Sequence, residues 1–292
     1  MKPILTRRSF LASSAMLMAG ATWHKGATSS SLQSISLSTS RPLGKTGITC
    51  SLVGMGTGVR SWNGESELTR KGRPAFMEVL EYACDQGITF FDLADMYGSH
   101  DYVKEALSTF MDRDKVMLST KTVSREPEAI RADLERFRKE LDTDVLDVVL
   151  MHCLTQRDGP DWRETLAPAM EVMAEAKAKG IIRAHGVSCH DFQAMEYAAA
   201  SDWVDVILAR INPAGVHMDG PVEDVVAILE ACHDSGKGVL GMKIIGEGGL
   251  HDRVRESLEF AMGLGCIDAM TIGFLDTAEI DDIAAKLEQI TL

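Results

Sequence analysis

Residues 116–152 read VMLSTKTVSREPEAIRADLERFRKELDTDVLDVVLMH, and this stretch decides the fold class of the chain. A short apolar run at 116–122 is followed by helical spacing of apolar residues at 129–141 and by a second apolar run at 146–152. Nearly continuous apolar strands that are joined through a helix are typical of neighbouring parallel strands in a sheet covered by helices. The stretch therefore predicts an α/β architecture.

The same alternation extends in both directions along the chain. Eight such units in about 250 residues match a closed (β/α)8 TIM barrel better than an open doubly wound sheet. Ahead of the first unit, the segment RPLGKTGITC at 41–50 contains a turn at 45–47, which predicts a short hairpin closing the bottom of the barrel. The expected strands lie at 51–57, 89–95, 116–122, 146–152, 184–190, 204–211, 238–244 and 268–274.

The N-terminus differs from the rest of the chain. TRRSFL at 6–11 contains an arginine pair and precedes an uncharged, fairly apolar stretch that ends on Ala-Gly-Ala at 19–21. This order is typical of a twin-arginine signal peptide, so we expect the export machinery as a partner and the periplasm as the destination. The predicted organisation is a signal peptide at 1–21, a flexible Ser/Thr-rich leader at 22–40 and one barrel domain at 41–292.

Composition excludes several classes of function. The chain has 292 residues and a formal net charge of −13, which argues against a nucleic-acid surface because such a surface needs a basic stripe. No apolar run reaches the roughly 18 residues that a stable membrane span requires. The six cysteines are scattered without zinc-like spacing, so no metal site is expected.

Polar residues stand at the carboxyl ends of the expected strands. Active sites of (β/α)8 barrels lie at this end, where loops and strand termini converge. Side chains that would be poor core residues should therefore gather at one rim. The strand-end residues are Thr57, Asp92, Lys121, His152, Ser188, Asn212, Lys243 and Gly273.

Four residues from three neighbouring units form a chemically coherent set. An ammonium such as that of Lys121 stabilises a nearby phenolate, so we expect the pKa of Tyr97 to be lowered by about two units. Asp92 can hold and orient the ammonium, and a neutral His152 can donate a hydrogen bond to a carbonyl oxygen. This set suits protonation of a carbonyl oxygen while hydride is delivered to its carbon.

The pattern resembles the aldo-keto reductase family from about residue 41 to the end of the chain. The resemblance implies a (β/α)8 barrel that binds NAD or NADP in extended form without a Rossmann domain. It also implies a catalytic tetrad of Asp92, Tyr97, Lys121 and His152, with Tyr97 as the general acid. The motifs are RPLGKTGITCSLVGMGTG (41–58), FFDLADMYG (90–98), LSTKT (118–122), LDVVLMH (146–152) and GVSCH (186–190).

Several cofactor positions depart from the family pattern. Cys189 stands where an asparagine usually follows Ser188 to hold the carboxamide, Leu208 replaces a glutamine, and Met242 replaces a stacking aromatic residue. Lys243 and the glycines at 246–249 suit a diphosphate, although the glycines also fit a plain βα turn. The full set of cofactor positions that we predict is Gly56, Thr57, Asp92, Ser188, Cys189, Leu208, Met242, Lys243, Ile245, Gly248, Gly273 and Glu279.

The segment GFLDTAEIDDI at 273–283 bears on the choice of cofactor. It has four acidic residues and no base, so the extra phosphate of NADP would meet repulsion and NAD is favoured. Asp276 and Glu279 also have the spacing of a helix capping box, which explains that pair without a ligand.

For the substrate side we expect His152, Trp62 and Arg210 to face a small carbonyl compound or a sugar. Surface packing for Trp62 and a rim salt bridge for Arg210 are equally good interpretations. The predicted function is an NAD(P)-dependent oxidoreductase that interconverts carbonyls and alcohols. The alternative is a redox-inactive barrel that acts as a periplasmic ligand-binding or partner module, since Cys189, Leu208 and Met242 all depart from the family pattern.

Overall fold

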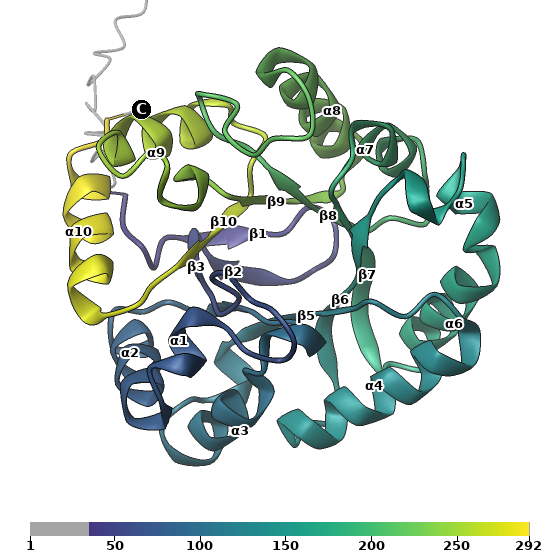
Figure 1. Cartoon of the computed structure of the whole chain (residues 1–292), viewed down its shortest axis with the longest axis horizontal. Coiled ribbons are helices and arrows are strands. Elements are labelled where there is room, and N and C mark those ends of the chain that lie inside the picture. Colours follow the sequence, from purple (N-terminus) through teal and green to yellow (C-terminus); the bar gives the residue numbers. More distant parts are fainter. Residues whose placement is uncertain (1–34, 292) are drawn as a thin grey trace, which may run out of the picture. The chain divides into compact units, whose positions relative to one another are not determined.

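The computed structural model describes residues 35–291, which form a closed barrel of eight parallel strands surrounded by helices (Figure 1). The barrel closes where the last strand pairs with the first, in the order β10-β3-β4-β5-β6-β7-β8-β9. This arrangement confirms the predicted (β/α)8 TIM barrel. The strands are β3 (Val53–Gly56), β4 (Phe90–Asp92), β5 (Met117–Thr122), β6 (Leu146–Leu154), β7 (Ile182–Cys189), β8 (Val206–Arg210), β9 (Gly238–Met242) and β10 (Ala269–Gly273).

Helices follow the strands and cover the outside of the barrel (Figure 1). In α4 (Pro127–Leu141) the buried side chains recur at helical spacing, which confirms the helix expected at 129–141. Among the residues described, no helix is both long and apolar enough to cross a membrane. The other helices are α1 (Glu67–Arg70), α2 (Arg73–Asp85), α3 (His100–Thr109), α5 (Trp162–Thr165), α6 (Ala167–Ala178), α7 (Phe192–Ala199), α8 (Val222–Ser235), α9 (Val254–Gly263) and α10 (Thr277–Glu288), with 3-10 turns η1 (Asp95–Tyr97), η2 (Arg113–Lys115), η3 (Gln156–Asp158) and η4 (Gly246–Gly248).

The amino-terminal hairpin closes the bottom of the barrel, as predicted. Strands β1 (Ser40–Pro42) and β2 (Thr49–Ser51) pair in antiparallel fashion. Leu43 and Ile48, from the connection between them, are buried in the inner core cluster with residues from the barrel strands. Because the turn reaches the barrel wall, a Cβ at Gly44 would lie 2.4 Å from the backbone nitrogen of Gly238.

The expected boundary between leader and barrel lies too far along the chain. Leu37 is only 3% exposed and belongs to the outer hydrophobic core, and its carbonyl accepts a hydrogen bond from Val53 N. The ordered domain therefore begins before residue 41, because the barrel needs an apolar side chain to cover the start of β3. The expected signal peptide and the leader up to residue 34 lie outside the described residues.

Side chains that alternate along each strand divide the core into a part inside the barrel and a part between the barrel and the helices. The same alternation positions the candidate site. On β6, Val148 and Leu150 point into the barrel, whereas Val149 and Met151 pack against the surrounding helices. Two residues beyond Leu150 on the same face stands His152. The same alternation gives one inward-facing residue near the carboxyl end of each strand: Gly56, Asp92, Lys121, His152, Ser188, Arg210, Met242 and Gly273.

Candidate active site

The ammonium of Lys121 lies at the centre of a buried polar cluster. Its Nζ donates to Asp92 Oδ1 at 2.6 Å and to the carbonyl oxygen of Leu93 at 2.8 Å. The third contact, at 3.5 Å, is with Tyr97 Oη. Asp92 and Lys121 are both buried, so their charges are compensated by each other and not by water.

The phenol of Tyr97 is carried by η1, the turn that directly follows β4. The turn ends at Gly98, whose φ of +67° is readily adopted by glycine. A Cβ at Gly58 would lie 2.4 Å from the Tyr97 ring, so the loop after β3 can pack on the phenol only because glycine stands there. Tyr97 Oη is 3.4 Å from His152 Nε2. The four predicted side chains therefore meet.

The acidity of Tyr97 differs from the sequence-based expectation. Burial raises the pKa of the phenol well above its usual value, and the Asp92 carboxylate raises it further. The expected lowering by Lys121 is wrong for this arrangement, because the ammonium lies much closer to Asp92 than to the phenol. Tyr97 therefore remains fully protonated at neutral pH.

His152 is the other polar group beside the phenol. Burial, and then the charge of Lys121, lowers its pKa to about 2, so the ring is neutral as expected. Its Nδ1 is buried and has no hydrogen-bond partner among the residues described. The carbonyl of His152 accepts a hydrogen bond from Arg125 Nη2 at 2.7 Å, which fixes the backbone near the end of β6.

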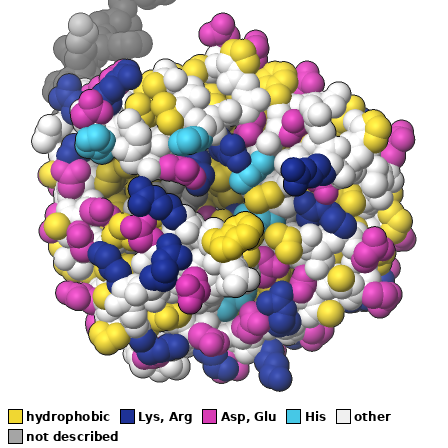
Figure 2. All heavy atoms as spheres, viewed as in Figure 1, with side chains coloured by type: hydrophobic (Ala, Val, Ile, Leu, Met, Phe, Trp, Pro, Cys, Tyr) yellow, Lys and Arg dark blue, Asp and Glu magenta, His cyan; other side chains and the backbone are white. Residues whose placement is uncertain are grey.

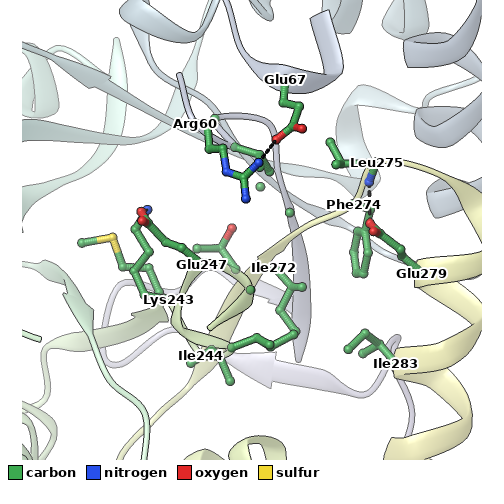
Figure 3. Close-up of a pocket in the computed structure, with 18 of the residues that line it drawn as sticks. Arg60, Glu67, Lys243, Ile244, Glu247, Ile272, Phe274, Leu275, Glu279 and Ile283 are labelled. Atoms are coloured by element: carbon green, nitrogen blue, oxygen red, sulfur yellow. Dashed lines mark hydrogen bonds and ion pairs between the residues drawn. The ribbon is translucent and has the colours of Figure 1, made fainter. Parts of the chain in front are cut away.

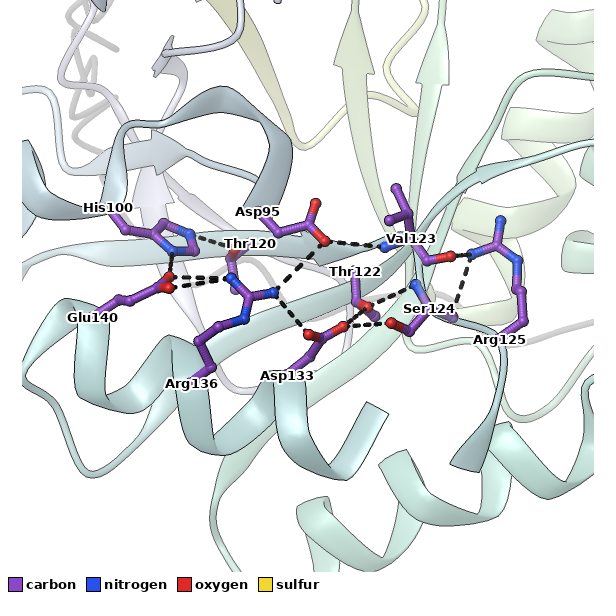
Figure 4. A network of polar contacts seen from close by, with 10 residues as sticks. All are labelled: Asp95, His100, Thr120, Thr122, Val123, Ser124, Arg125, Asp133, Arg136 and Glu140. Atoms are coloured by element: carbon purple, nitrogen blue, oxygen red, sulfur yellow. Dashed lines mark hydrogen bonds and ion pairs between the residues drawn. The ribbon is translucent and has the colours of Figure 1, made fainter. Parts of the chain in front are cut away.

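A polar network on the outer side of β5 supports the turn that carries Tyr97 (Figure 4). Arg136, on α4, donates to Asp133 at 2.7 Å and lies 3.9 Å from the carboxylate of Asp95, the first residue of η1. Asp95 also accepts a hydrogen bond from Val123 N. These contacts tie the η1 turn to α4 and to the loop after β5.

A cavity of about 630 Å³ opens beside this cluster. It extends from Asp92 and Tyr97, past the ends of β9 and β10, to the start of α10 (Figure 3). In the close-up, Ile244, Ile272 and Ile283 form the apolar part of its wall. The predicted cofactor residues that line it are Gly56, Asp92, Met242, Lys243, Ile245, Gly248, Gly273 and Glu279.

The cavity fits a nicotinamide dinucleotide in size and in polarity. Its volume lies within the range of ligand pockets, and its wall combines apolar side chains with a few charged ones. Ser188 Oγ does not line the cavity, but it is buried on the inward face of β7 without a hydrogen-bond partner among residues 35–291, as expected for a group that awaits an amide. Residues 35–291 contain no cluster of three His, Cys, Asp or Glu side chains suited to a metal ion.

Two cations of the cavity wall are already paired with carboxylates. Lys243 pairs with Glu247 of η4, and Arg60 lies 3.3 Å from Glu67 (Figure 3). Lys243, which the strand-end pattern assigned to the diphosphate, therefore shares its charge with Glu247. That pattern missed Arg60, Glu67 and Glu247 because all three stand on loops or at a helix start, where no strand or helix period marks the inward face.

Four predicted cofactor residues do not line the cavity: Thr57, Ser188, Cys189 and Leu208. Cys189 faces outward into the core between barrel and helices, because alternation that points Ser188 inward must point its neighbour outward. Leu208 is fully buried in the inner core, one layer below the mouth. Thr57 Oγ1 contacts Asp92 O at 2.9 Å and Ser99 Oγ at 2.8 Å, so it braces the strand ends.

The predicted substrate residues have different environments. The side chain of Trp62 is 78% exposed, in a loop that contacts η1 through the hydrogen bond from Gly64 N to Met96 O. Arg210 points into the mouth of the barrel and lies 3.4 Å from Asp219, so the alternative of a rim salt bridge holds at least in part.

The start of α10 confirms that Asp276 and Glu279 serve as a helix cap. Asp276 caps the helix by accepting a hydrogen bond from Glu279 N at 3.1 Å, and Glu279 accepts one from Leu275 N at 2.7 Å. A cation that the sequence did not indicate lies nearby, since Lys71 Nζ donates to the Leu275 carbonyl at 2.7 Å.

Comparison with known proteins places the chain in a family. Residues 54–263 match the aldo/keto reductase family. Over 170 residues the chain is 34% identical to aldo-keto reductase YhdN of Bacillus subtilis, an alignment that covers 52% of this chain and 47% of that protein. A mouse protein, aldo-keto reductase family 1 member C21, is 29% identical over 139 residues, with 41% and 43% covered. The chain thus spans about half the length of the curated relatives it matches.

Solved structures show the same fold. An aldo-keto reductase from Bacillus halodurans in its holo form has a TM-score of 0.69 at 16% identity, covering 87% of this chain and 92% of that one. An aldo-keto reductase from Klebsiella pneumoniae in complex with NADPH has a TM-score of 0.64 at 21% identity, covering 86% and 90%.

The closed barrel and the polar cluster at its mouth define a (β/α)8 barrel protein with a candidate active site at the carboxyl ends of its strands. The match over residues 54–263 then identifies the chain plainly: it belongs to the aldo/keto reductase family.

Proposed function

We propose that the protein is an NAD(P)-dependent oxidoreductase that interconverts carbonyl compounds and alcohols, with Tyr97 as proton donor. The observation that carries this proposal is the meeting of Tyr97 Oη with Lys121 Nζ at 3.5 Å and with His152 Nε2 at 3.4 Å. Tyr97, Asp92, Met242 and Lys243 all border the same cavity. A ligand-binding barrel without turnover would have no need of a phenol paired with a buried ammonium.

In the direction of reduction, the chain's own residues manage the proton. The raised pKa keeps Tyr97 protonated until a carbonyl oxygen reaches it, and neutral His152 can orient that oxygen through its ring nitrogen. As the proton leaves, the phenolate that forms lies beside the Lys121 ammonium. Attraction between unit charges at this separation is about 5 kcal/mol at an effective dielectric constant of 20, so Lys121 stabilises the product of proton transfer.

A bound nicotinamide would supply or accept the hydride. Ser188 Oγ would hold its amide, Met242 would pack on its ring with a polarizable thioether, and Lys243 would reach the diphosphate. The backbone turn at η4 supports the last role, since Gly246 and Gly248 both have positive φ and bring the chain close to the cavity.

NAD is the cofactor that we propose, in preference to NADP. Asp276, Glu279 and Asp282 line the end of the cavity at α10. Lys286 pairs with Asp282, and Lys71 donates to the nearby Leu275 carbonyl. Three carboxylates against two ammonium groups leave a net negative charge, which disfavours a 2′-phosphate. Fluorescence titration with NADH and NADPH tests this preference, and tighter binding of NADPH would refute it.

We further propose that the protein is exported through the twin-arginine route and acts in the periplasm. The support is the arginine pair at 7–8, the apolar stretch behind it and the Ala-Gly-Ala at 19–21. This route carries folded proteins, so cofactor bound in the cytoplasm would travel with the enzyme. Fractionation of cells that express the full chain, compared with a variant in which Arg7 and Arg8 are both replaced by lysine, tests the proposal; an unprocessed cytoplasmic protein in both cases would contradict it.

The central test of the activity is Tyr97→Phe. Removing the proton donor should lower kcat/KM for carbonyl reduction by roughly 10²- to 10⁴-fold. The hydroxyl makes only long contacts, so NADH binding and thermal stability should change little. Tyr102→Phe is the matched control, because Tyr102 stacks on Phe76 outside the cavity. Unchanged reduction by Tyr97→Phe would refute the assignment.

A further inference from the structure

Two arginines at the mouth of the barrel are bonded very differently. Arg125 donates through Nε to Asp158 at 2.5 Å, through Nη1 to the carbonyl of Val123 at 3.1 Å, and through Nη2 to the carbonyl of His152 at 2.7 Å. All three of its nitrogens therefore serve the fold. Arg125 is a structural arginine that braces the loops after β5 and β6.

Arg210 makes one hydrogen bond within the described residues. It stands at the end of β8, on the inward face, two residues beyond Leu208. Its Nη1 donates to the carbonyl of His217 at 3.2 Å. Its Nε is buried without any partner in the described chain, and Nη2 donates to no described group either. A buried donor without a partner is rare in folded proteins and indicates an absent ligand or water.

The unused nitrogens form one edge of the guanidinium. The group is planar, and Nε–H together with one Nη2–H presents two parallel donors that match the two oxygens of a carboxylate. Because Nη1 is held by the loop after β8, the Nε/Nη2 edge is turned to the other side. The loop thus holds Nη1 and leaves Nε and Nη2 without a partner in the described chain.

Asp219 does not use this edge. Its Oδ1 lies 3.4 Å from Nη1, and its Oδ2 is buried without a partner in residues 35–291. Burial raises the pKa of Asp219 to about 6, although the charge of Arg210 acts in the opposite direction. The distance of 3.4 Å exceeds the 2.6 Å between Lys121 Nζ and Asp92 Oδ1. The pair is a loose one, in contrast to the pair that Lys121 forms with Asp92.

The side chains between Arg210 and the phenol carry no charge. Burial is the main cause that lowers the pKa of His190 to about 3, and the charge of Arg210 is the next cause. The rings of His190 and His152 are 6.4 Å apart, and Cys153 Sγ lies 3.7 Å from His190 Nε2. Burial raises the pKa of the Cys153 thiol, so it too is neutral.

These neutral groups form a path from Tyr97, past His152 and His190, toward Arg210. In Figure 2, Lys, Arg and His side chains lie around the hollow at this end of the barrel, together with acidic and hydrophobic ones. The ammonium of Lys121 is already compensated by Asp92. Arg210 is therefore the positive group that keeps free donors for a substrate on this side of the mouth.

We propose that the Nε/Nη2 edge of Arg210 binds the carboxylate of the substrate, so that the preferred substrates are carbonyl compounds bearing a carboxylate group. This inference rests on the proposed function, which assigns proton donation to Tyr97. The carbonyl of such a molecule would lie against Tyr97 and His152 while its carboxylate reaches across the mouth to Arg210. Aldehyde acids and oxo acids have this chemistry, whereas neutral sugars lack it.

The test compares each acid with its methyl ester, which removes the charge and keeps the carbonyl. We use pyruvate with methyl pyruvate for a short reach, and 4-carboxybenzaldehyde with methyl 4-formylbenzoate for a long one. The wild-type protein should prefer the acid in at least one pair. In Arg210→Gln the acid-to-ester ratio of kcat/KM in that pair should fall by about tenfold to hundredfold, mainly through KM. Arg210→Lys should keep part of the preference, since its charge remains but its fork is lost.

Arg157→Gln is the matched control. It makes the same change of charge on η3, at the same end of the barrel, and the Arg157 side chain is exposed. Its ratio should remain that of the wild type. If Arg210→Gln leaves the ratio unchanged in both pairs, or if wild type prefers both esters, the proposal is wrong.

A second measurement needs no turnover. Benzoate binding, followed by isothermal titration calorimetry on the purified protein, should weaken at least tenfold in Arg210→Gln. Equal binding by wild type and Arg210→Gln would overturn the carboxylate site. If benzoate binds as expected but no carbonyl compound is reduced, the site stands and the proposed oxidoreductase function fails instead.

Discussion

The two ends of the barrel treat their buried polar groups differently. At the amino-terminal end, Asp147 accepts hydrogen bonds from Leu118 N at 2.9 Å and from Arg183 Nη1 at 2.8 Å, and it lies 2.9 Å from Arg113 Nη2. Asp268, at the same end, accepts from Gly44 N at 3.0 Å and from Val239 N at 2.9 Å. These carboxylates join strands to the hairpin and to one another.

At the carboxyl-terminal end, several buried atoms have no partner in the described chain. They include His152 Nδ1, Ser188 Oγ, Arg210 Nε and Asp219 Oδ2. His185 Nδ1, near the amino-terminal end, is also without a partner among residues 35–291. Since an unsatisfied buried polar group destabilises the fold, the group of such atoms around the mouth indicates that ligands complete it. The amino-terminal end of the barrel therefore contributes to stability, whereas the carboxyl-terminal end keeps unpaired groups that reduce stability and can bind a ligand.

The largest expected effect combines both roles in a single residue. Lys121→Met should abolish carbonyl reduction, and it should lower the free energy of unfolding by roughly 3–5 kcal/mol because Asp92 is left buried without its ammonium. Urea denaturation and an activity assay measure the two effects. Lys177→Met, which breaks the half-exposed pair with Asp205 toward the other end, should lower the free energy of unfolding by less than about 1 kcal/mol and leave activity intact. Equal destabilisation by the two variants would contradict this comparison.

Acid should act on both ends through buried histidines. Burial lowers the pKa of His152 to about 2, and that of His185, stacked on Trp203 near the amino-terminal end, to about 4. Below the ordinary histidine pKa of about 6.5 the unfolded chain binds a proton that the folded chain does not, so stability falls as the pH falls.

The pH effect has a defined size and window. Each of the two histidines should remove about 1.4 kcal/mol of unfolding free energy per pH unit below pH 6, until the pH reaches its folded pKa. Urea denaturation at pH 6.0, 5.5 and 5.0, with pH 7.5 as the reference, measures the slope, and His152→Gln and His185→Gln should each flatten it by one proton. A slope that neither variant changes would show that other groups cause the acid sensitivity.

The smallest expected effects come from a matched pair of serines. Ser51 Oγ, at the amino-terminal end, donates to the Val53 carbonyl at 2.7 Å and accepts from Thr89 N at 2.9 Å. Ser51→Ala should therefore lower the unfolding free energy by about 2 kcal/mol. Ser188→Ala should change it by less than about 0.5 kcal/mol, because Ser188 Oγ has no partner to lose among residues 35–291.

The two serine variants should rank in the opposite order when their affinity for NADH is measured. Ser188→Ala should weaken NADH binding several-fold in a fluorescence titration, since it removes the group that we propose for the nicotinamide amide. Ser51→Ala should leave that affinity unchanged, because the residue lies at the other end of the barrel. If Ser188→Ala binds NADH as well as wild type, the amide contact is wrong.

Much of the fold and part of the site followed from local pattern. The apolar runs predicted all eight strands, and the polar residue that ends a strand predicted that Asp92, Lys121 and His152 would converge. Cys189 was misplaced although the same pattern should have excluded it, because neighbours on a strand face opposite sides. Leu37 was missed because a lone apolar residue before the first strand carries no period.

Other features had no signal in the sequence. The pKa of Tyr97 rose where a fall was expected, since its direction depends on how deeply the ring is buried and on which partner holds Lys121. The pairing of Lys243 with Glu247, and of Arg60 with Glu67, depends on how loops pack over the cavity. No periodicity describes such loops.

The order of apolar and polar residues by itself determined a parallel barrel, the face on which each strand residue stands and the set of side chains at its mouth. That is possible because a strand turns successive side chains to opposite faces, whatever surrounds it. Only the tertiary structure decided which of those polar groups find partners and which, like Ser188 Oγ and Arg210 Nε, remain without one. Hydrogen-bond partners come from segments distant in the chain, and their packing fixes both the pKa of Tyr97 and the free edge of Arg210.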